Sequence, residues 1–213
     1  MAKRKLRKWV KWALAVIIVG AISSVAMALY PKIPRKNLIE DLKSVQIPEY
    51  VTVDLIPKGL VHSRNGLFLE DVKNIVIHYV GNPGTSAKNN RDYFANEGTR
   101  VNAHFVVGLD GEIIQCVPLY ERSSASNHRN KDTISIEVCH PDAAGEFNRV
   151  TMDSLIKLTA WLCEICELDK KDVIRHYDVT GKLCPIYYVN NENEWNKLLN
   201  NINDELKRRI YEQ

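Results

Sequence analysis

One apolar run decides the class of fold, and it consists of residues Asn74-Ile75-Val76-Ile77-His78-Tyr79-Val80. Its β-branched residues and its short length favour a strand over a helix. Alternation along a strand places Val76, His78 and Val80 on one face. A lone histidine in such a strand is more often a hydrogen-bonded core residue than a metal ligand. His78 therefore indicates chemistry only if other parts of the chain supply partners for it.

Strand and helix signals alternate on both sides of this run. A helix is predicted at residues 86–96, and two strands at 101–108 and 112–117 form a hairpin around Leu109-Asp110-Gly111. The remaining predicted elements are strands at 133–139 and 173–175 and helices near 37–45, at 151–167 with Thr151 as its N-cap, and at 192–210. This order predicts one α/β domain at residues 51–213, in which helices flank a mixed central β-sheet.

The amino-terminal segment predicts a transmembrane anchor or an export signal. Residues 1–11 carry six Lys or Arg, and residues 12–30 form an uncharged run of 19 residues. As a helix this run would span roughly 28 Å, close to the ~30 Å hydrocarbon core of a bilayer. The basic flank predicts that residues 1–11 stay in the cytoplasm and that residues 31–50, a proline-containing spacer, lead to an extracytoplasmic domain. The alternative is a signal peptide cleaved near Ala28, which would release a secreted protein.

Charge is distributed unevenly between the two parts of the chain. Residues 1–36 hold nine Lys or Arg and no acidic residue, whereas residues 37–213 hold 20 basic and 26 acidic residues. Proteins that bind nucleic acid present a basic patch on the folded domain, and this domain is acidic. We therefore expect no nucleic-acid partner, and we expect the membrane to be a partner of the amino-terminal helix.

The five cysteines cannot all pair within the chain. Cys163 and Cys166 lie near the end of a helical pattern, whereas a redox Cys-x-x-Cys motif opens a helix after a strand. A zinc ribbon would need a second such motif, which is absent from the sequence. These two cysteines are therefore predicted to be small core residues.

Two histidines and one cysteine form a group of candidate metal ligands. His176 and Cys184 are separated by seven residues in a segment predicted as a loop, and His78 lies on the central strand. Two imidazoles and one thiolate suit Zn²⁺, and three protein ligands with one open position are typical of a catalytic site. A structural zinc site is the alternative, and it would need His104 or Cys139 as a fourth ligand.

Glu137 adds a carboxylate to the predicted strand at 133–139. Alternation places Ser135 and Glu137 on the face opposite to the apolar residues. A carboxylate in a central strand is typically paired, linked to a metal or catalytic, and the plainer alternative is a salt bridge to a neighbouring arginine. A serine hydrolase is not indicated, because no Gly-x-Ser-x-Gly motif occurs.

Taken together, the motifs resemble one known family. They are Ile77-His78-Tyr79, Asn102-Ala103-His104-Phe105-Val106-Val107, Asp110-Gly111, Ser135-Ile136-Glu137 and His176-Tyr177-Asp178 through Lys182-Leu183-Cys184-Pro185. From about residue 50 to 190 the chain is similar to the zinc-dependent type 2 N-acetylmuramoyl-L-alanine amidases. These share the fold of the peptidoglycan recognition proteins and the phage amidase lysozymes, so the resemblance implies that fold.

The resemblance also implies a site and a reaction. His78, His176 and Cys184 would hold Zn²⁺, and Glu137 and Lys182 would be catalytic. The implied substrate is peptidoglycan, cleaved by an activated water at the amide between N-acetylmuramic acid and the L-Ala of the stem peptide. Glu137 would move the proton and Lys182 would stabilise the oxyanion. We expect a monomer.

The chain differs from the family's pattern at several positions. Phage-lysozyme-like members place a tyrosine where this chain has Ala103, which leaves proton transfer to Glu137. The Trp-His common before the glutamate strand is Asn127-His128 here, so a substrate contact by His128 is not expected. His104 either contacts substrate or is structural or supports a ligand, and the second role is favoured. A non-catalytic peptidoglycan-binding module is the alternative function. Such modules lack the cysteine ligand, and the presence of Cys184 favours catalysis.

Overall fold

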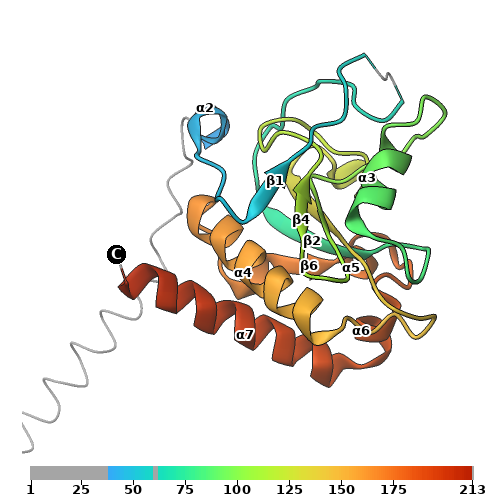
Figure 1. The fold of residues 1–213 in the computed structure, drawn as a ribbon. Coiled ribbons are helices and arrows are strands. Elements are labelled where there is room, and N and C mark those ends of the chain that lie inside the picture. The colour runs from blue at the N-terminus through green and yellow to red at the C-terminus, as the bar shows by residue number, and fades with distance from the viewer. Residues whose placement is uncertain (1–37, 60–61, 213) are drawn as a thin grey trace, which may run out of the picture. The chain divides into compact units, whose positions relative to one another are not determined.

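The computed structural model describes residues 38–59 and 62–212 (Figure 1). A compact unit covers Asn37–Gln213. The predicted cytoplasmic segment at 1–11 and the predicted transmembrane helix at 12–30 lie outside the described residues. Among the helices that are described, none combines the length and the apolar composition needed to cross a bilayer.

A six-stranded mixed sheet forms the centre of the compact unit. The strands lie in the order β1-β4-β3-β5-β2-β6, and β3 and β4 form the predicted antiparallel hairpin while the other neighbours are parallel. Their bounds are β1 Val51–Val53, β2 Asn74–Tyr79, β3 Phe105–Val107, β4 Ile113–Gln115, β5 Thr133–Val138 and β6 Val173–Arg175. The predicted α/β class with a mixed central sheet is confirmed.

Helices cover the sheet on both faces (Figure 1). On one face α4 (Arg149–Ile165) and the closing helix α7 (Glu192–Tyr211) pack side by side, and their apolar residues form one core with Ile75 and Ile77 of β2. On the other face α3 (Ala87–Phe94) packs over β3 and β4 and forms a second core with Val106 and Ile114. Burial on both faces explains why β2 is apolar almost throughout.

The helices α3 and α4 begin with different N-cap residues. Ser86 caps α3, and its Oγ accepts a hydrogen bond from the Asn89 backbone N–H. The prediction of Thr151 as the N-cap of α4 is wrong, because Asn148 Oδ1 accepts from the Thr151 N–H at 3.0 Å. Thr151 instead donates its hydroxyl to the Gly108 carbonyl at 2.8 Å, which ties the first turn of α4 to the hairpin.

Short elements account for the other differences from the prediction. The segment after β6 was expected to be a loop, and it contains two five-residue helices, α5 (His176–Thr180) and α6 (Ile186–Asn190). The short helix α2 (Leu38–Ser44) was predicted, and its Leu38 and Leu42 pack into the core beside α4. Two 3-10 turns complete the described elements, η1 at Asn127–Arg129 and η2 at Lys170–Asp172.

All five cysteines are free and buried. Cys163 on α4 and Cys166 at its C-cap belong to the core that α4 forms with the sheet, so the prediction that they are core residues is confirmed.

Candidate metal centre and active site

Strand register brings His78 and Glu137 side by side. β2 and β5 are parallel neighbours, and His78 pairs directly with Glu137 one residue before the carboxyl end of each strand. His78 Nδ1 lies 3.9 Å from Glu137 Oε1. No arginine is paired with Glu137 among the described residues, so the alternative of a salt bridge to a neighbouring arginine is not supported.

His176, the second histidine, directly follows β6, which pairs with β2 on the side opposite to β5. β6 ends at Arg175, and His176 is the first residue of α5. The Arg175 guanidinium fixes this corner because it pairs with Asp178 at 3.0 Å and with Glu192 at 2.7 Å. Gly181 ends α5 with a φ of 77°, a left-handed conformation that favours glycine. The chain then turns back, and the Tyr177 N–H donates to the Cys184 carbonyl at 2.9 Å.

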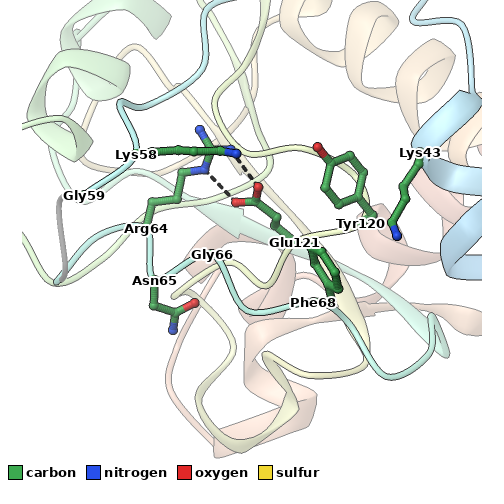
Figure 2. A pocket seen from close by; sticks show the side chains of 9 residues that line it. All are labelled: Lys43, Lys58, Gly59, Arg64, Asn65, Gly66, Phe68, Tyr120 and Glu121. Carbon is green, nitrogen blue, oxygen red and sulfur yellow. Dashed lines mark hydrogen bonds and ion pairs between the residues drawn. The ribbon is translucent and has the colours of Figure 1, made fainter.

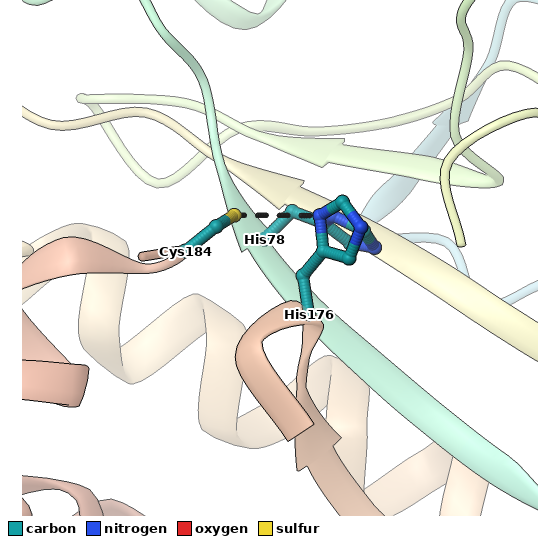
Figure 3. Close-up of side chains that lie close together, drawn as sticks. All are labelled: His78, His176 and Cys184. Atoms are coloured by element: carbon teal, nitrogen blue, oxygen red, sulfur yellow. Dashed lines mark hydrogen bonds between the residues drawn. The ribbon is translucent and has the colours of Figure 1, made fainter. Parts of the chain in front are cut away.

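His78, His176 and Cys184 converge in one buried cluster (Figure 3). One ligand atom from each lies within 4.8 Å of the others. Cys184 Sγ lies 4.0 Å from His78 Nδ1, and the two imidazole rings have centroids 4.5 Å apart. Tetrahedral Zn²⁺ bond lengths place a sulfur and a nitrogen ligand about 3.6 Å apart. The cluster is therefore close to the dimensions of a metal site.

Atoms without hydrogen-bond partners support the same interpretation. Both ring nitrogens of His176 and Glu137 Oε2 are buried and have no partner. Buried polar atoms are usually satisfied, so each such atom in a native fold needs an explanation. Two imidazoles and a thiol are also the donor set that a borderline-soft divalent metal prefers. The residues present therefore fit a metal ion.

The alternative of a fourth protein ligand is not supported within the described residues. His104 uses both ring nitrogens elsewhere, because Nδ1 accepts from the Ser135 N–H at 3.0 Å and Nε2 donates to the Glu121 carbonyl at 2.8 Å. Cys139 lies beside Asn90 instead of the cluster. Among these residues the candidate metal group has three members, which leaves a coordination position for water or substrate.

Burial controls the protonation of the cluster. It lowers the pKa of His78 well below the ordinary value, with smaller contributions from His176 and Lys182. The pKa of His176 is lowered by burial and by Lys182. Burial raises the pKa of the Cys184 thiol to about 12. Without metal the cluster is therefore two neutral imidazoles and a neutral thiol, and metal binding must release the thiol proton.

Glu137 gives a testable pH dependence in the metal-free chain. Burial raises the pKa of its carboxyl to about 8, and Lys182 opposes this shift. Between about pH 4.5 and 8 the folded chain keeps a proton that the unfolded chain releases, so this group destabilises the fold as pH rises. Glu137→Gln removes that titration. We expect its stability relative to wild type to increase across this window and to level off above about pH 8, measured by denaturant unfolding with a chelator. A difference that does not change with pH would contradict the assignment.

The cluster lies in the wall of a cleft of about 980 Å³. Glu137 keeps 19% of its side chain exposed and lines the cleft, and Lys182 is an exposed lining residue two positions before Cys184. The other walls come from α3, from Arg100 and Val101, and from the loop that contains Ser124 and Asn130. His128 and Ala103 are not among the residues that line the cleft. The arrangement can hold a metal, a proton acceptor and a cation beside an extended substrate.

One residue near the cluster was not predicted. Ser126 is fully buried, and its Oγ lies 3.3 Å from His78 Nε2. The sequence places Ser126 in a polar loop 48 residues after His78, so no periodicity or motif connects the two.

A second pocket shares no lining residue with the cleft (Figure 2). Its wall contains a buried ion pair in which Arg64 Nε and Nη2 donate to the two Glu121 carboxylate oxygens at 2.6 and 2.7 Å. Phe68 and Tyr120 form an edge-to-face pair in its lining, with the Lys43 ammonium 4.7 Å from the Phe68 ring centroid. None of the predicted site residues lies there.

Comparisons with known proteins match the part of the chain that contains the cluster. The family model described as N-acetylmuramoyl-L-alanine amidase matches residues 69–186, which is more than half of the chain. BlyA of Bacillus subtilis (strain 168), named an N-acetylmuramoyl-L-alanine amidase, is 34% identical over 155 residues, which are 63% of this chain and 42% of BlyA. CwlL of Bacillus licheniformis, with the same description, is 32% identical over 152 residues, which are 62% of this chain and 41% of CwlL.

Solved structures give the same fold. The catalytic domain of XlyA superposes with a TM-score of 0.63 at 26% identity, covering 71% of this chain and 98% of that domain. PlyL superposes with a TM-score of 0.63 at 20% identity over 71% of this chain and 96% of PlyL, and at that identity it supports the fold alone. The chain spans about two fifths of the length of the curated relatives that it matches.

Proposed function

Because this chain belongs to the N-acetylmuramoyl-L-alanine amidase family, we propose that it hydrolyses the amide between N-acetylmuramic acid and the L-Ala of the peptidoglycan stem peptide. One observation gives the main support for this proposal. His78, His176 and Cys184 lie within 4.8 Å of one another in the wall of the cleft, and Glu137 lies 3.9 Å from one of these ligands. The three ligands and the open cleft support a hydrolytic site over a closed structural one.

We propose Zn²⁺ as the metal, held by His78, His176 and Cys184. When bound, Zn²⁺ supplies a Lewis acid that lowers the pKa of water toward about 7 and polarises a carbonyl. The two imidazoles are already neutral, which is the form that ligates metal. The buried thiol supplies the third ligand after it loses its proton.

Glu137 is the proposed proton carrier. Its Oε2 has no partner in the protein and is free to accept a proton from the attacking water. The same oxygen then donates that proton to the amine nitrogen of the leaving L-Ala, so the carboxylate is regenerated in each cycle. The pKa of this carboxyl, which burial raises in the metal-free chain, would be lowered by bound Zn²⁺, so that its ionised form would be present to accept the proton near neutral pH.

Lys182 is the proposed oxyanion stabiliser, and this role gives a prediction. Lys182→Ala should retain zinc and lower kcat by about 10²–10³, the range for loss of one oxyanion donor. Lys207→Ala on α7 is the matched control, because it removes an exposed ammonium that is not among the cleft-lining residues. Steady-state kinetics with zinc analysis measure both. A change in KM alone would show that Lys182 only binds substrate.

Product analysis tests the function itself. Residues 37–213 with zinc should release new free L-Ala amino termini from purified peptidoglycan, detected by mass spectrometry. New reducing sugar ends alone would indicate a glycosidase. Binding of peptidoglycan without any new terminus would indicate the non-catalytic module instead.

We further propose that residues 12–30 anchor the chain in the cell membrane with residues 31–213 outside the cytoplasm. The uncharged run of 19 residues after six basic residues supports this topology. Protease added to intact, wall-stripped cells should therefore remove the domain, and immunoblotting measures the loss. A cytoplasmic protein expressed in the same cells is the control, and a protected domain would refute the topology. Release of the domain into the medium would favour cleavage near Ala28.

A further inference from the structure

Three buried hydroxyls connect to the metal ligand His78. Ser126 Oγ lies 3.3 Å from His78 Nε2, and 3.0 Å from Ser135 Oγ. Ser123 Oγ donates to Ser135 Oγ at 3.1 Å. All three serines are at most 2% exposed. The far side of the His78 ring therefore meets a continuous chain of hydroxyls instead of solvent.

The position of Ser126 is fixed from several directions. Ser135 lies on β5, two residues before Glu137, so the sheet holds one end of the hydroxyl chain. Asn130 Oδ1 accepts from the Ser126 N–H at 2.6 Å and from the Ala125 N–H at 3.1 Å, which fixes the backbone of the loop. A serine held in this way loses little conformational entropy when it forms one more hydrogen bond.

The geometry shows which nitrogen of His78 faces the metal position. Nδ1 lies 4.0 Å from Cys184 Sγ and 3.9 Å from Glu137 Oε1, whereas Nε2 points to Ser126. A neutral imidazole carries one proton, so ligation through Nδ1 requires that Nε2 carries it and has an acceptor. Ser126 Oγ is the partner that the described residues provide. His176 has no equivalent partner, since both of its nitrogens lack one.

We propose that Ser126, supported by Ser135 and Ser123, is a positioning residue that holds His78 in the Nε2–H tautomer and leaves Nδ1 free to bind the metal. This inference rests on the metal site of the proposed function. In this arrangement Ser126 Oγ accepts from His78 Nε2–H and donates its own proton to Ser135 Oγ, which also accepts from Ser123 Oγ.

The same loop also forms one wall of the cleft. Ser124, Ala125, Asn127 and Asn130 line the cleft on either side of Ser126 in the sequence. The loop that lines the cleft is thereby attached to the proposed metal ligand His78 through one hydrogen bond. Ser126 acts through His78 and does not itself line the cleft.

Zinc affinity tests the proposal without relying on activity. Ser126→Ala leaves Nε2–H without an acceptor, and loss of such a partner typically lowers metal affinity 10- to 100-fold. Ser135→Ala leaves the direct contact in place, and we expect a smaller loss. Ser63→Ala is the matched control, because Ser63 is buried and its hydroxyl has no partner in the fold. The measurement is competition for Zn²⁺ with a chromophoric chelator, using the full-length chain in a mild detergent.

A second measurement needs no variant. Long-range ¹H–¹⁵N spectra of the zinc-loaded wild-type chain report the tautomer of each histidine, so they remain decisive if Ser126→Ala fails to fold. We expect His78 to carry its proton on Nε2 with Nδ1 coordinated.

Two results would overturn the proposal: a folded Ser126→Ala chain that binds zinc within twofold of wild type, or a His78 that is protonated on Nδ1. A wild-type chain that binds no zinc would overturn the proposed function instead. A failure of the proposed role of Ser126 is thus distinguishable from a failure of the proposed function.

Discussion

Glu137→Gln is expected to lower kcat by roughly 10²–10⁴ while zinc stays bound, the range for loss of acid–base catalysis. Glutamine keeps the size and the hydrogen-bonding capacity of the side chain but accepts no proton at neutral pH. The sheet register keeps position 137 opposite His78 whatever the side chain, so the ligands should not move. Turnover of purified peptidoglycan and zinc content, measured on the same sample, separate chemistry from metal binding.

Glu70→Gln is the control for this experiment, because Glu70 forms only surface ion pairs with Arg122 and Lys131. Near-full turnover of Glu137→Gln with zinc bound would make Glu137 a structural residue. Lys182 would then be the candidate for moving the proton, because both nitrogens of His104 are already engaged. A loss confined to KM would indicate uniform substrate binding.

Cys184→Ser is expected to lose most of the zinc and with it nearly all activity. The thiolate is the soft donor of the set, and a serine hydroxyl keeps its proton at neutral pH and binds zinc poorly. Two imidazoles then remain, which is fewer than the three protein ligands of typical catalytic zinc sites. In the wild type, affinity should fall as pH falls, because the thiol with a pKa raised to about 12 must lose a proton to bind. Elemental analysis after dialysis measures the zinc.

Cys139→Ala provides the matched control, since it removes another buried thiol that lies outside the metal cluster. It should keep one zinc per chain. If Cys184→Ser retained as much zinc as wild type, and His78→Ala did also, the assignment of the metal site would be wrong.

The sheet could be predicted from the sequence more fully than the segment after β6. β2 is predictable because burial on both faces demands an apolar run, against which His78 stands out. β5 is predictable because its apolar residues alternate with polar ones, among which Glu137 is the carboxylate. α5 and α6 have five residues each, which is less than two helical turns, so no periodicity develops. The N-cap of α4 was misplaced because Asn148 and Thr151 are both good capping residues three positions apart.

The same contrast applies to the candidate site. Glu137 stands out by residue type, because a carboxylate is rare in a buried strand. Histidine and cysteine are common enough in a core that the order of the family's motifs, and not residue type alone, identified His78, His176 and Cys184. Ser126 and Asn130 are common loop residues whose importance comes from hydrogen bonds across the fold. Such roles depend on tertiary contacts, which the spacing of residues along the chain does not encode.

The strand order also determines when the metal site can form. β2 lies between β5 and β6, both of which come later in the chain, and His78 meets Cys184 across 106 residues. Contacts between such distant residues form late, because the ends of a long loop must first be brought together. A chain interrupted after β5 would contain His78 and Glu137 but neither His176 nor Cys184. Nascent or truncated chains should therefore be inactive, and hydrolytic activity should begin only after residue 184 has been synthesised and folded.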